Sequence, residues 1–241
     1  MPRVVSPPGV VTVAQGDGTS NSLVSVAGSA AFASASAWSC WVTINNIVNE
    51  QPICISDGTS NNYVTVYAIP SAVHIALGRG GSPILDNALS ITPAQLAAYG
   101  WLCLALSVSA AGATVWGGGT QLYSTSTDSH LTLGATPSVT FCGRYGIPYR
   151  NYIAEPAIYT SLSHADATAI AAGERPATRP GHVESWPMCE RLTATSLAGV
   201  NGHTATLGST TKLVTNLLRV AASGRVAVSG RVASSGRVTP T

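Results

Sequence analysis

The residues of this chain that could do chemistry are its ten acidic residues, its five histidines and its serines. No two acidic residues stand at positions i and i+2, the spacing that would place two carboxylates on one face of a strand for glycoside hydrolysis. The chain has no GxSxG elbow and no phosphate-binding loop. The histidines lack the HxH or HExxH spacing of a zinc site, and we expect surface or hydrogen-bonded roles for positions 74, 130, 164, 182 and 203. The sequence therefore predicts a protein that is not an enzyme, with no cofactor and no metal.

Two related loops carry oxygen-bearing side chains that could hold an ion or a sugar. They read DGTSNS at 17–22 and DGTSNN at 57–62. Carboxylate and amide oxygens bind calcium and sugar hydroxyls, which makes Asp57, Asn61 and Asn62 the candidate carbohydrate or ion site. The same residue types form tight turns, and one carboxylate per loop is few for Ca²⁺. We favour the turn interpretation.

The last residues form a repeat that spaces four arginines evenly. From residue 219 the chain reads RVAASG, RVAVSG, RVASSG and RVTPT, which places arginines at Arg219, Arg225, Arg231 and Arg237. A spacing of six residues puts all four on one face of a strand and also aligns them in a polyproline-II arm. Two interpretations stay open: a low-complexity disordered tail, or a partner-binding arm that becomes ordered on its partner.

The charge composition favours association with other proteins. Charged residues make up only 9% of the chain, against roughly 25% in an average soluble domain. A surface of Ser and Thr hydroxyls protects poorly against association, so we expect packing against neighbours, including a homo-oligomer. All acidic residues fall at or before Glu190, which leaves a basic segment behind it. Arginines without aromatic residues between them argue against binding to nucleic acid.

The cysteines and the apolar runs indicate where the protein is made. The five cysteines are an odd number, and most stand in apolar runs, so we expect buried free thiols and assembly in a reducing cytoplasm. The first residues lack the apolar core of a signal peptide. No apolar run reaches the roughly 18 residues that a membrane-spanning helix needs. We therefore expect no membrane partner.

The elements that must position these residues are mostly short strands. Alternation of apolar and small polar residues predicts strands at 23–26, 38–44, 63–67, 73–77, 102–108, 114–116 and 138–142. Two short helices are expected, one at 92–99 with Thr92 as its cap, and one at 163–173 that begins at Ser163 and ends at Gly173. This pattern predicts an all-β fold: a two-sheet antiparallel jelly-roll sandwich with one or two short helices and extended terminal arms.

Several segments together resemble a known superfamily. They are SAWSCWV at 36–42, YGWLCLAL at 99–106, TVWGGG at 114–119, YIAEPAIY at 152–159 with SLS at 161–163, and HVESWPM at 182–188. In order and spacing they resemble the laminin-G-like branch of the concanavalin A-like lectin/glucanase superfamily, a jelly roll also found in bacteriophage virion proteins. The resemblance covers roughly residues 10–190 and implies the two-sheet sandwich.

The chain departs from the glucanases of that superfamily. Their catalytic strand carries two or three carboxylates at alternate positions, whereas Glu155 stands alone, with Ala157 and Tyr159 at the following same-face positions. The tryptophans within strand runs are expected in the core rather than on a sugar-stacking surface. They are Trp38, Trp41, Trp101 and Trp116.

The expected organisation has three parts: an N-terminal extended arm at 1–12, a concanavalin A-like jelly-roll domain at 13–190, and a basic C-terminal extension at 191–241 with hexapeptide RVxxSG repeats. Two functions fit it. The first is a bacteriophage capsid decoration (cement) protein, made in the host cytoplasm, that docks through its arms on the major capsid protein or another virion protein. The alternative is a carbohydrate-binding, lectin-like module of a phage tail or host-adhesion protein.

Overall fold

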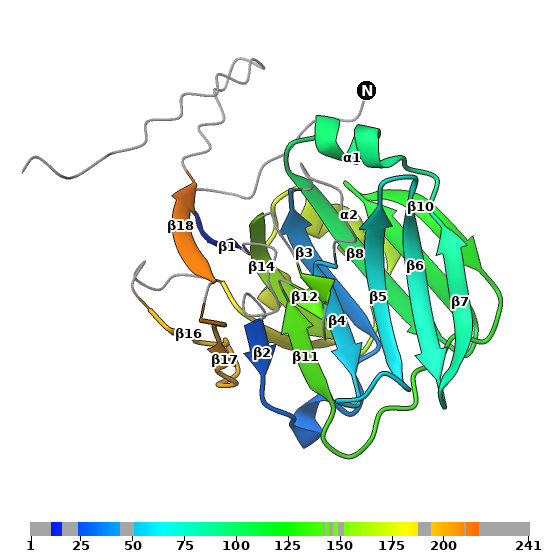
Figure 1. Cartoon of the computed structure of the whole chain (residues 1–241), viewed down its shortest axis with the longest axis horizontal. Helices are drawn as coiled ribbons and strands as arrows, with labels where there is room; N and C mark the ends of the chain where they lie inside the picture. The colour runs from blue at the N-terminus through cyan, green and yellow to red at the C-terminus, as the bar shows by residue number, and fades with distance from the viewer. Residues whose placement is uncertain are drawn as a thin grey trace, which may run out of the picture.

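The computed structural model describes residues 11–15, 24–43, 51–141, 143–144, 147–148, 152–187, 194–209 and 211–216. Two antiparallel sheets pack against each other as layers (Figure 1). The first sheet has the order β10 (Thr120–Thr125), β9 (Gly112–Gly117), β8 (Leu102–Ser109), β3 (Ala37–Val42), β14 (Tyr152–Tyr159), β1 (Val11–Gln15) and β18 (Lys212–Asn216), and β15 (His182–Ser185) also pairs with β14.

The second sheet contains the central hairpins of the chain. Its order is β16 (Ser196–Leu197), β17 (Ala205–Thr206), β2 (Val24–Val26), β11 (Ser138–Phe141), β4 (Ile53–Ser56), β5 (Tyr63–Ile69), β6 (Ala72–Arg79) and β7 (Ser82–Ala88). A separate two-stranded ribbon consists of β12 (Gly143–Arg144) and β13 (Ile147–Pro148). The predicted two-sheet sandwich is confirmed, and each of the seven predicted strand segments overlaps an observed strand.

The core between the sheets follows from the two-residue period of a strand. In β8, Leu102, Leu104 and Leu106 point between the sheets, while Cys103 and Ala105 point to the other side of the first sheet. Both sets are buried, because a second layer of side chains packs on the outer side of the first sheet. The molecule therefore has two apolar layers rather than one.

The second layer is made by a helix. α2 (His164–Ala171) begins at Ser163, whose hydroxyl accepts a hydrogen bond from the Asp166 backbone N–H. It ends before Gly173, whose φ of 100° is the left-handed conformation expected there. Its Ala167 and Ile170 are buried with the outward-pointing side chains of the first sheet.

The other predicted helix is also present. α1 (Pro93–Ala98) has a capping box, in which the Thr92 hydroxyl accepts from the Gln95 N–H and the Gln95 side chain accepts from the Thr92 N–H. Two single turns of 3₁₀-helix, η2 (Ala30–Phe32) and η3 (Pro176–Thr178), complete the elements. Among the described residues, no helix is long and apolar enough to cross a membrane.

The sheets extend further along the chain than the sequence predicted. We expected the sandwich to end at residue 190, but β17 pairs with β2 in the second sheet and β18 pairs with β1 in the first. These strands lie within residues 191–241, which the sequence assigned to the C-terminal extension. Backbone pairing continues to Asn216, because short strands far along the sequence complete both sheet edges.

The thiols of the described cysteines match the expectation. Cys40, Cys54 and Cys103 are buried thiols outside any disulfide. Burial, together with the nearby Glu155 carboxylate, raises the pKa of Cys103 to about 12, which keeps the thiol protonated and unreactive. Cys142 and Cys189 lie outside the described residues.

Candidate functional site

The loop at 57–62 joins β4 to β5 and closes on itself. Asp57 Oδ1 accepts hydrogen bonds from the Thr59 backbone N–H (2.8 Å) and hydroxyl (2.6 Å), and Asp57 Oδ2 accepts one from Asn62 Nδ2 (2.6 Å). Partial burial raises the pKa of Asp57, but the bonds from Asn62 and Thr59 outweigh this, and the net pKa is below the ordinary value. Both carboxylate oxygens have partners inside the loop, which is the geometry of a turn.

The same loop is tied to the β6–β7 turn. Asn62 Oδ1 accepts from the Gly80 N–H (2.8 Å), and the Asn61 carbonyl accepts from the Gly81 N–H (3.1 Å). The structure therefore brings Asp57, Asn61 and Asn62 together, and their hydrogen bonds connect two turns. A sugar- or ion-binding role for these three stays a prediction. Within the part of the chain that the structure describes, no group of three potential metal-ligating side chains occurs.

The other predicted site residues cannot be placed. Arg219, Arg225, Arg231 and Arg237 lie outside the described residues, as does the loop at 17–22. Their role as a partner-binding arm stays a prediction.

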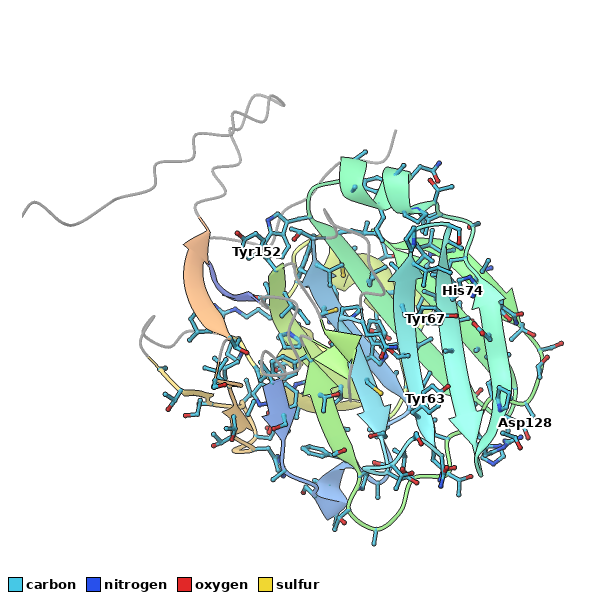
Figure 2. The ribbon with its side chains drawn as sticks, viewed as in Figure 1. Tyr63, Tyr67, His74, Asp128 and Tyr152 are labelled. Atoms are coloured by element: carbon cyan, nitrogen blue, oxygen red, sulfur yellow. The ribbon has the colours of Figure 1, made fainter. Side chains whose placement is uncertain are left out.

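A group of aromatic and polar side chains lies on the outer side of the second sheet, across β5, β6 and β7 (Figure 2). We call it the open face and define it as Tyr63, Tyr67, His74 and Asp86. Tyr67 and His74 are register partners on β5 and β6, and their rings stack with centroids 5.0 Å apart and an interplanar angle of 23°. All four residues are partly or largely exposed.

Asp86 fixes the orientation of this pair. Its Oδ1 accepts a hydrogen bond from the Tyr67 hydroxyl (2.6 Å) and lies 3.0 Å from His74 Nδ1. Burial raises the pKa of Tyr67, and the bond to the Asp86 carboxylate raises it further, so the phenol stays protonated and donates. With Nδ1–H donating to the carboxylate, His74 Nε2 is left as an acceptor.

The open face keeps hydrogen-bonding capacity for a ligand. Asp86 Oδ2 and His74 Nε2 have no hydrogen-bond partner among the described residues, and the two side chains are 59% and 20% exposed. Aromatic rings next to unused polar atoms are the usual composition of a small-molecule binding surface. This capacity distinguishes the open face from the loop at 57–62, where both Asp57 carboxylate oxygens and the Asn62 side-chain amide are already paired.

Tyr63 extends the open face along β5, and a glycine makes room for it. Its register partner is Gly78 on β6, and a Cβ at that position would lie 2.5 Å from Tyr63 Cε1. The phenol ring therefore lies flat over the β6 backbone. Tyr63 and Tyr67 are four residues apart on one strand face, which separates them by about 13 Å at roughly 3.3 Å per residue.

Charged residues border the open face at the β6–β7 turn. Arg79 Nη1 lies 3.3 Å from Asp128 Oδ2, and His130 Nδ1 lies 2.6 Å from Asp128 Oδ1. The hydrogen bond from the His130 side chain is the main reason that the pKa of Asp128 is lowered, which keeps this carboxylate ionised. Figure 2 places Asp128 at the end of the sheet beyond Tyr63.

The outer side of the first sheet has a different composition. We call it the covered face and define it as Trp41, Trp101, Cys103 and Trp116, which are buried with α2 packed over them. Trp41 and Trp116 are only 2% and 5% exposed. The prediction that the strand tryptophans are core residues is confirmed, although only Trp38 lies between the two sheets.

Glu155 lies at a bulge in β14. The register between β14 and β3 shifts between Ala154 and Ala157, and Glu155 has a φ of 49°. The simple alternation expected from Glu155 through Ala157 is therefore wrong, because the bulge puts Ala154 and Ala157 on the same side of the sheet. Burial raises the pKa of Glu155, while Arg175 partly opposes the shift.

The histidines are dispersed, as expected, and four of them have hydrogen-bond partners. His74 and His130 contact aspartates, His164 contacts the Gly119 carbonyl, and His203 contacts Glu184. His182 departs from the expectation, because its Nε2 is buried without a hydrogen-bond partner in the described part of the chain. Burial lowers the pKa of His182 accordingly.

Comparison with known proteins gives structural neighbours only. No protein-family model and no curated protein sequence matches the chain. A Bacteroides ovatus protein proposed to bind carbohydrate is similar with a TM-score of 0.60 and 12% identity, over 87% of this chain and 61% of that one. A heptameric pentraxin from Limulus polyphemus has a TM-score of 0.51 and 10% identity, over 83% of this chain and 96% of that one.

A third neighbour, domains LG4-5 of the mouse laminin α1 chain, has a TM-score of 0.49 and 14% identity, over 68% of this chain and 46% of that one. At identities this low the first two likenesses show the fold alone, a two-sheet jelly roll. This chain spans 61% of the length of the Bacteroides ovatus structure.

Proposed function

We propose that the chain is a lectin-like binding domain whose open face binds carbohydrate. The observation that carries this is the Tyr67–His74–Asp86 arrangement, where two stacked rings lie beside a largely exposed carboxylate. A sugar ring has an apolar C–H side that packs on an aromatic ring and hydroxyls that need donors and acceptors at its edge. The open face offers both.

The extent of the open face favours an oligosaccharide over a single sugar. Tyr63 and Tyr67 lie along one strand, about 13 Å apart at roughly 3.3 Å per residue. The hydrogen bonds of Asp86 to the Tyr67 hydroxyl and His74 hold the carboxylate in place before any ligand arrives, which reduces the entropy lost on binding. The fold is compatible with this role, because a neighbour of the same architecture is proposed to bind carbohydrate.

A glycan array followed by calorimetry on the best ligand tests the proposal. Tyr67→Ala should weaken binding at least tenfold, about 1.4 kcal/mol, because it removes the stacking surface. Asp86→Asn should weaken it less, since one amide oxygen remains. Asp128→Asn is the matched control, as Asp128 is similarly exposed and also contacts a histidine. Absence of any bound glycan, or a folded Tyr67→Ala variant with unchanged affinity, would sink the proposal.

A second candidate function, decoration of a phage capsid, is supported by the pairing of β1 with β18. Val11 pairs with Asn216 at the outer edge of the first sheet. The segments 1–10 and 217–241 are therefore both attached at this one edge, and the second carries Arg219, Arg225, Arg231 and Arg237. Two segments anchored at one place would suit docking of the domain on a shell protein of a virion, with the arginines pairing with acidic groups.

A truncation separates the two functions. The cut belongs after Asn216, because residues 212–216 form β18 and their loss would remove one of the two strands that pair with β1. The truncated chain should keep glycan binding and lose co-sedimentation with particles assembled from the major capsid protein. Normal occupancy of such particles by the truncated chain would exclude the docking role.

A further inference from the structure

Three residues from distant parts of the chain meet at one end of the sandwich. Ser29 follows β2, Glu184 belongs to β15, and His203 precedes β17. Ser29 Oγ lies 3.1 Å from His203 Nε2, and His203 Nδ1 lies 2.8 Å from Glu184 Oε2. A hydroxyl, an imidazole and a carboxylate in this order, each within hydrogen-bond reach of the next, form the arrangement that activates a serine nucleophile.

The carboxylate is placed to set the tautomer of the imidazole. Glu184 is fully buried and accepts backbone N–H bonds from Ser185 (2.9 Å), Asn201 (2.8 Å) and His203 (3.0 Å). Burial raises the pKa of Glu184, but the hydrogen bonds from Asn201 and His203 outweigh it and lower the pKa overall. The ionised carboxylate can only accept, so Nδ1 of the imidazole carries the proton and Nε2 presents its lone pair to the Ser29 hydroxyl.

Hydrogen bonds fix the backbone of His203 at both its N–H and its carbonyl, and a ring contact fixes its imidazole. The His203 N–H donates to Glu184, and the His203 carbonyl accepts from Trp186 Nε1 at 2.8 Å. The ring also packs on Phe32, with centroids 4.7 Å apart. Phe32 belongs to η2, the turn that Ser29 caps, so one short element positions both the hydroxyl and the ring. Such fixed geometry is what a catalytic base needs before substrate arrives.

The hydroxyl is reachable by a substrate. Ser29 is partly exposed, the His203 side chain is 29% exposed, and Ala30 and Ala31 beside Ser29 are exposed. The backbone N–H of Ala30 makes no hydrogen bond within the described part of the chain. The amide that follows a nucleophilic serine is a common donor to the oxyanion of the tetrahedral intermediate.

We propose that Ser29, His203 and Glu184 form a hydrolytic site for esters of short acyl groups. Ser29 Oγ attacks the ester carbonyl carbon while its proton passes to His203 Nε2. The bond to the alcohol oxygen then breaks, and that oxygen takes the proton from Nε2. Water next attacks the acyl-serine, gives a proton to Nε2, and the released acid leaves Ser29 to recover that proton. The net reaction is ester plus water to alcohol plus acid.

The roles of the three residues differ. Ser29 and His203 are the catalytic residues, and Glu184 is a positioning residue that acts through His203. The residues next to Ser29 in the chain offer little apolar surface for a long acyl chain, because Gly28 has no side chain and Ala30 and Ala31 have only a methyl group. An acetyl ester is therefore the substrate class that fits.

The test uses the full chain with a fluorophosphonate probe and p-nitrophenyl acetate. Mass spectrometry should map the probe adduct to Ser29, and Ser29→Ala should lower acetate hydrolysis by about 100-fold, the contribution typical of a positioned base and its nucleophile. Ser34→Ala, an exposed serine close by in the chain, is the matched control and should keep wild-type hydrolysis. Added imidazole should restore part of the activity of His203→Ala, which a purely structural histidine would not allow.

Glu184→Gln tests positioning separately, and should lower kcat with little change in KM. Where that variant fails to fold, the adduct map of the wild-type chain still decides. An adduct absent from Ser29, or a folded Ser29→Ala variant as active as the wild type, would overturn the proposal. Glycan binding by Ser29→Ala and ester hydrolysis by Tyr67→Ala should both be unchanged, so this site and the open face can fail independently.

Discussion

The covered face and the open face lie on the outer sides of the two antiparallel sheets, yet their aromatic residues differ in burial. On the first sheet, Trp41 and Trp116 are buried because α2 packs over them. On the second sheet, Tyr67 and His74 keep access to solvent, and their polar atoms are organised by Asp86. Alternation along a strand decides which side a residue faces. The presence of a covering element decides whether that side becomes core or a binding surface.

The largest difference between the faces should appear on truncation of an aromatic residue. Trp116→Ala should lower the free energy of unfolding by about 3–5 kcal/mol, as large-to-small changes in a core do. Tyr67→Ala should lower it by about 1 kcal/mol or less while abolishing ligand stacking. Urea unfolding of both variants measures this, and equal losses would remove the distinction between the faces.

The next largest effect concerns the partly buried carboxylate of Glu155 in the first sheet. Glu155, in the bulge of β14, has a raised pKa because of burial, and its φ of 49° suits glycine. Glu155→Gly should stabilise the protein by about 1 kcal/mol at neutral pH, since strain of this kind costs about 1–3 kcal/mol and glycine loses some of that gain to entropy.

The charge on Glu155 can be tested by pH. A raised folded-state pKa means that the folded protein holds the proton more tightly, so stability falls as the pH rises from the ordinary glutamate value through the raised one. Glu155→Gln should therefore match the wild type at low pH and exceed it at neutral pH in thermal unfolding. Glu174→Gln, which replaces an exposed glutamate paired with Arg179, is the control variant. A constant difference at all pH values would contradict the assignment.

The packing of α2 over the covered face can be weakened by a substitution at its N-cap. Ser163→Ala removes the N-cap of α2 and should cost about 1 kcal/mol. It should also speed alkylation of Cys103 in the native protein, because α2 packs with this thiol in the covered face. Thr92→Ala removes the equivalent cap of α1, which lies outside the covered face, and should leave the alkylation rate closer to that of the wild type.

The smallest effect concerns the alkylation rate of Cys103 in the wild-type protein. Burial raises the pKa of Cys103 to about 12, so the reactive thiolate is scarce at neutral pH. Iodoacetamide should label Cys103 far more slowly in the native protein than after unfolding, as peptide mapping by mass spectrometry would reveal. Rapid labelling of the native chain would mean that α2 does not seal the covered face.

Local features were predictable from the sequence. The caps at Thr92 and Ser163, the glycine at 173 and the alternation in β8 depend on neighbours within a few residues, and the structure confirms them. The strands beyond residue 190 were not predicted, because β16 and β17 have two residues each and are strands only through the pairing of β17 with β16 and β2. Nothing in such short segments signals a partner so distant in sequence.

The sites were less predictable for the same reason. Tyr63 and Tyr67 alternate with Val64 and Val66 just as buried residues do, so only the position of α2 on the other sheet shows that their side is left open. Ser29 and His203 are 174 residues apart, and motif searches for serine nucleophiles examine a few neighbouring residues. Conversely, the side-chain oxygens of the loop at 57–62 suggested an ion or sugar site, but the Asp57 oxygens form hydrogen bonds within the turn.

The pairing of Val11 with Asn216 determines how the domain would respond to a mechanical load. In this antiparallel ladder the hydrogen bonds run across the strands. A pull on the segments before Val11 and after Asn216 would separate β1 from β18 one pair at a time, from this end toward Gln15 and Lys212. Tension would thus detach the edge strand by unzipping at low force, while the hairpins of β5, β6 and β7 stay outside the path of the load.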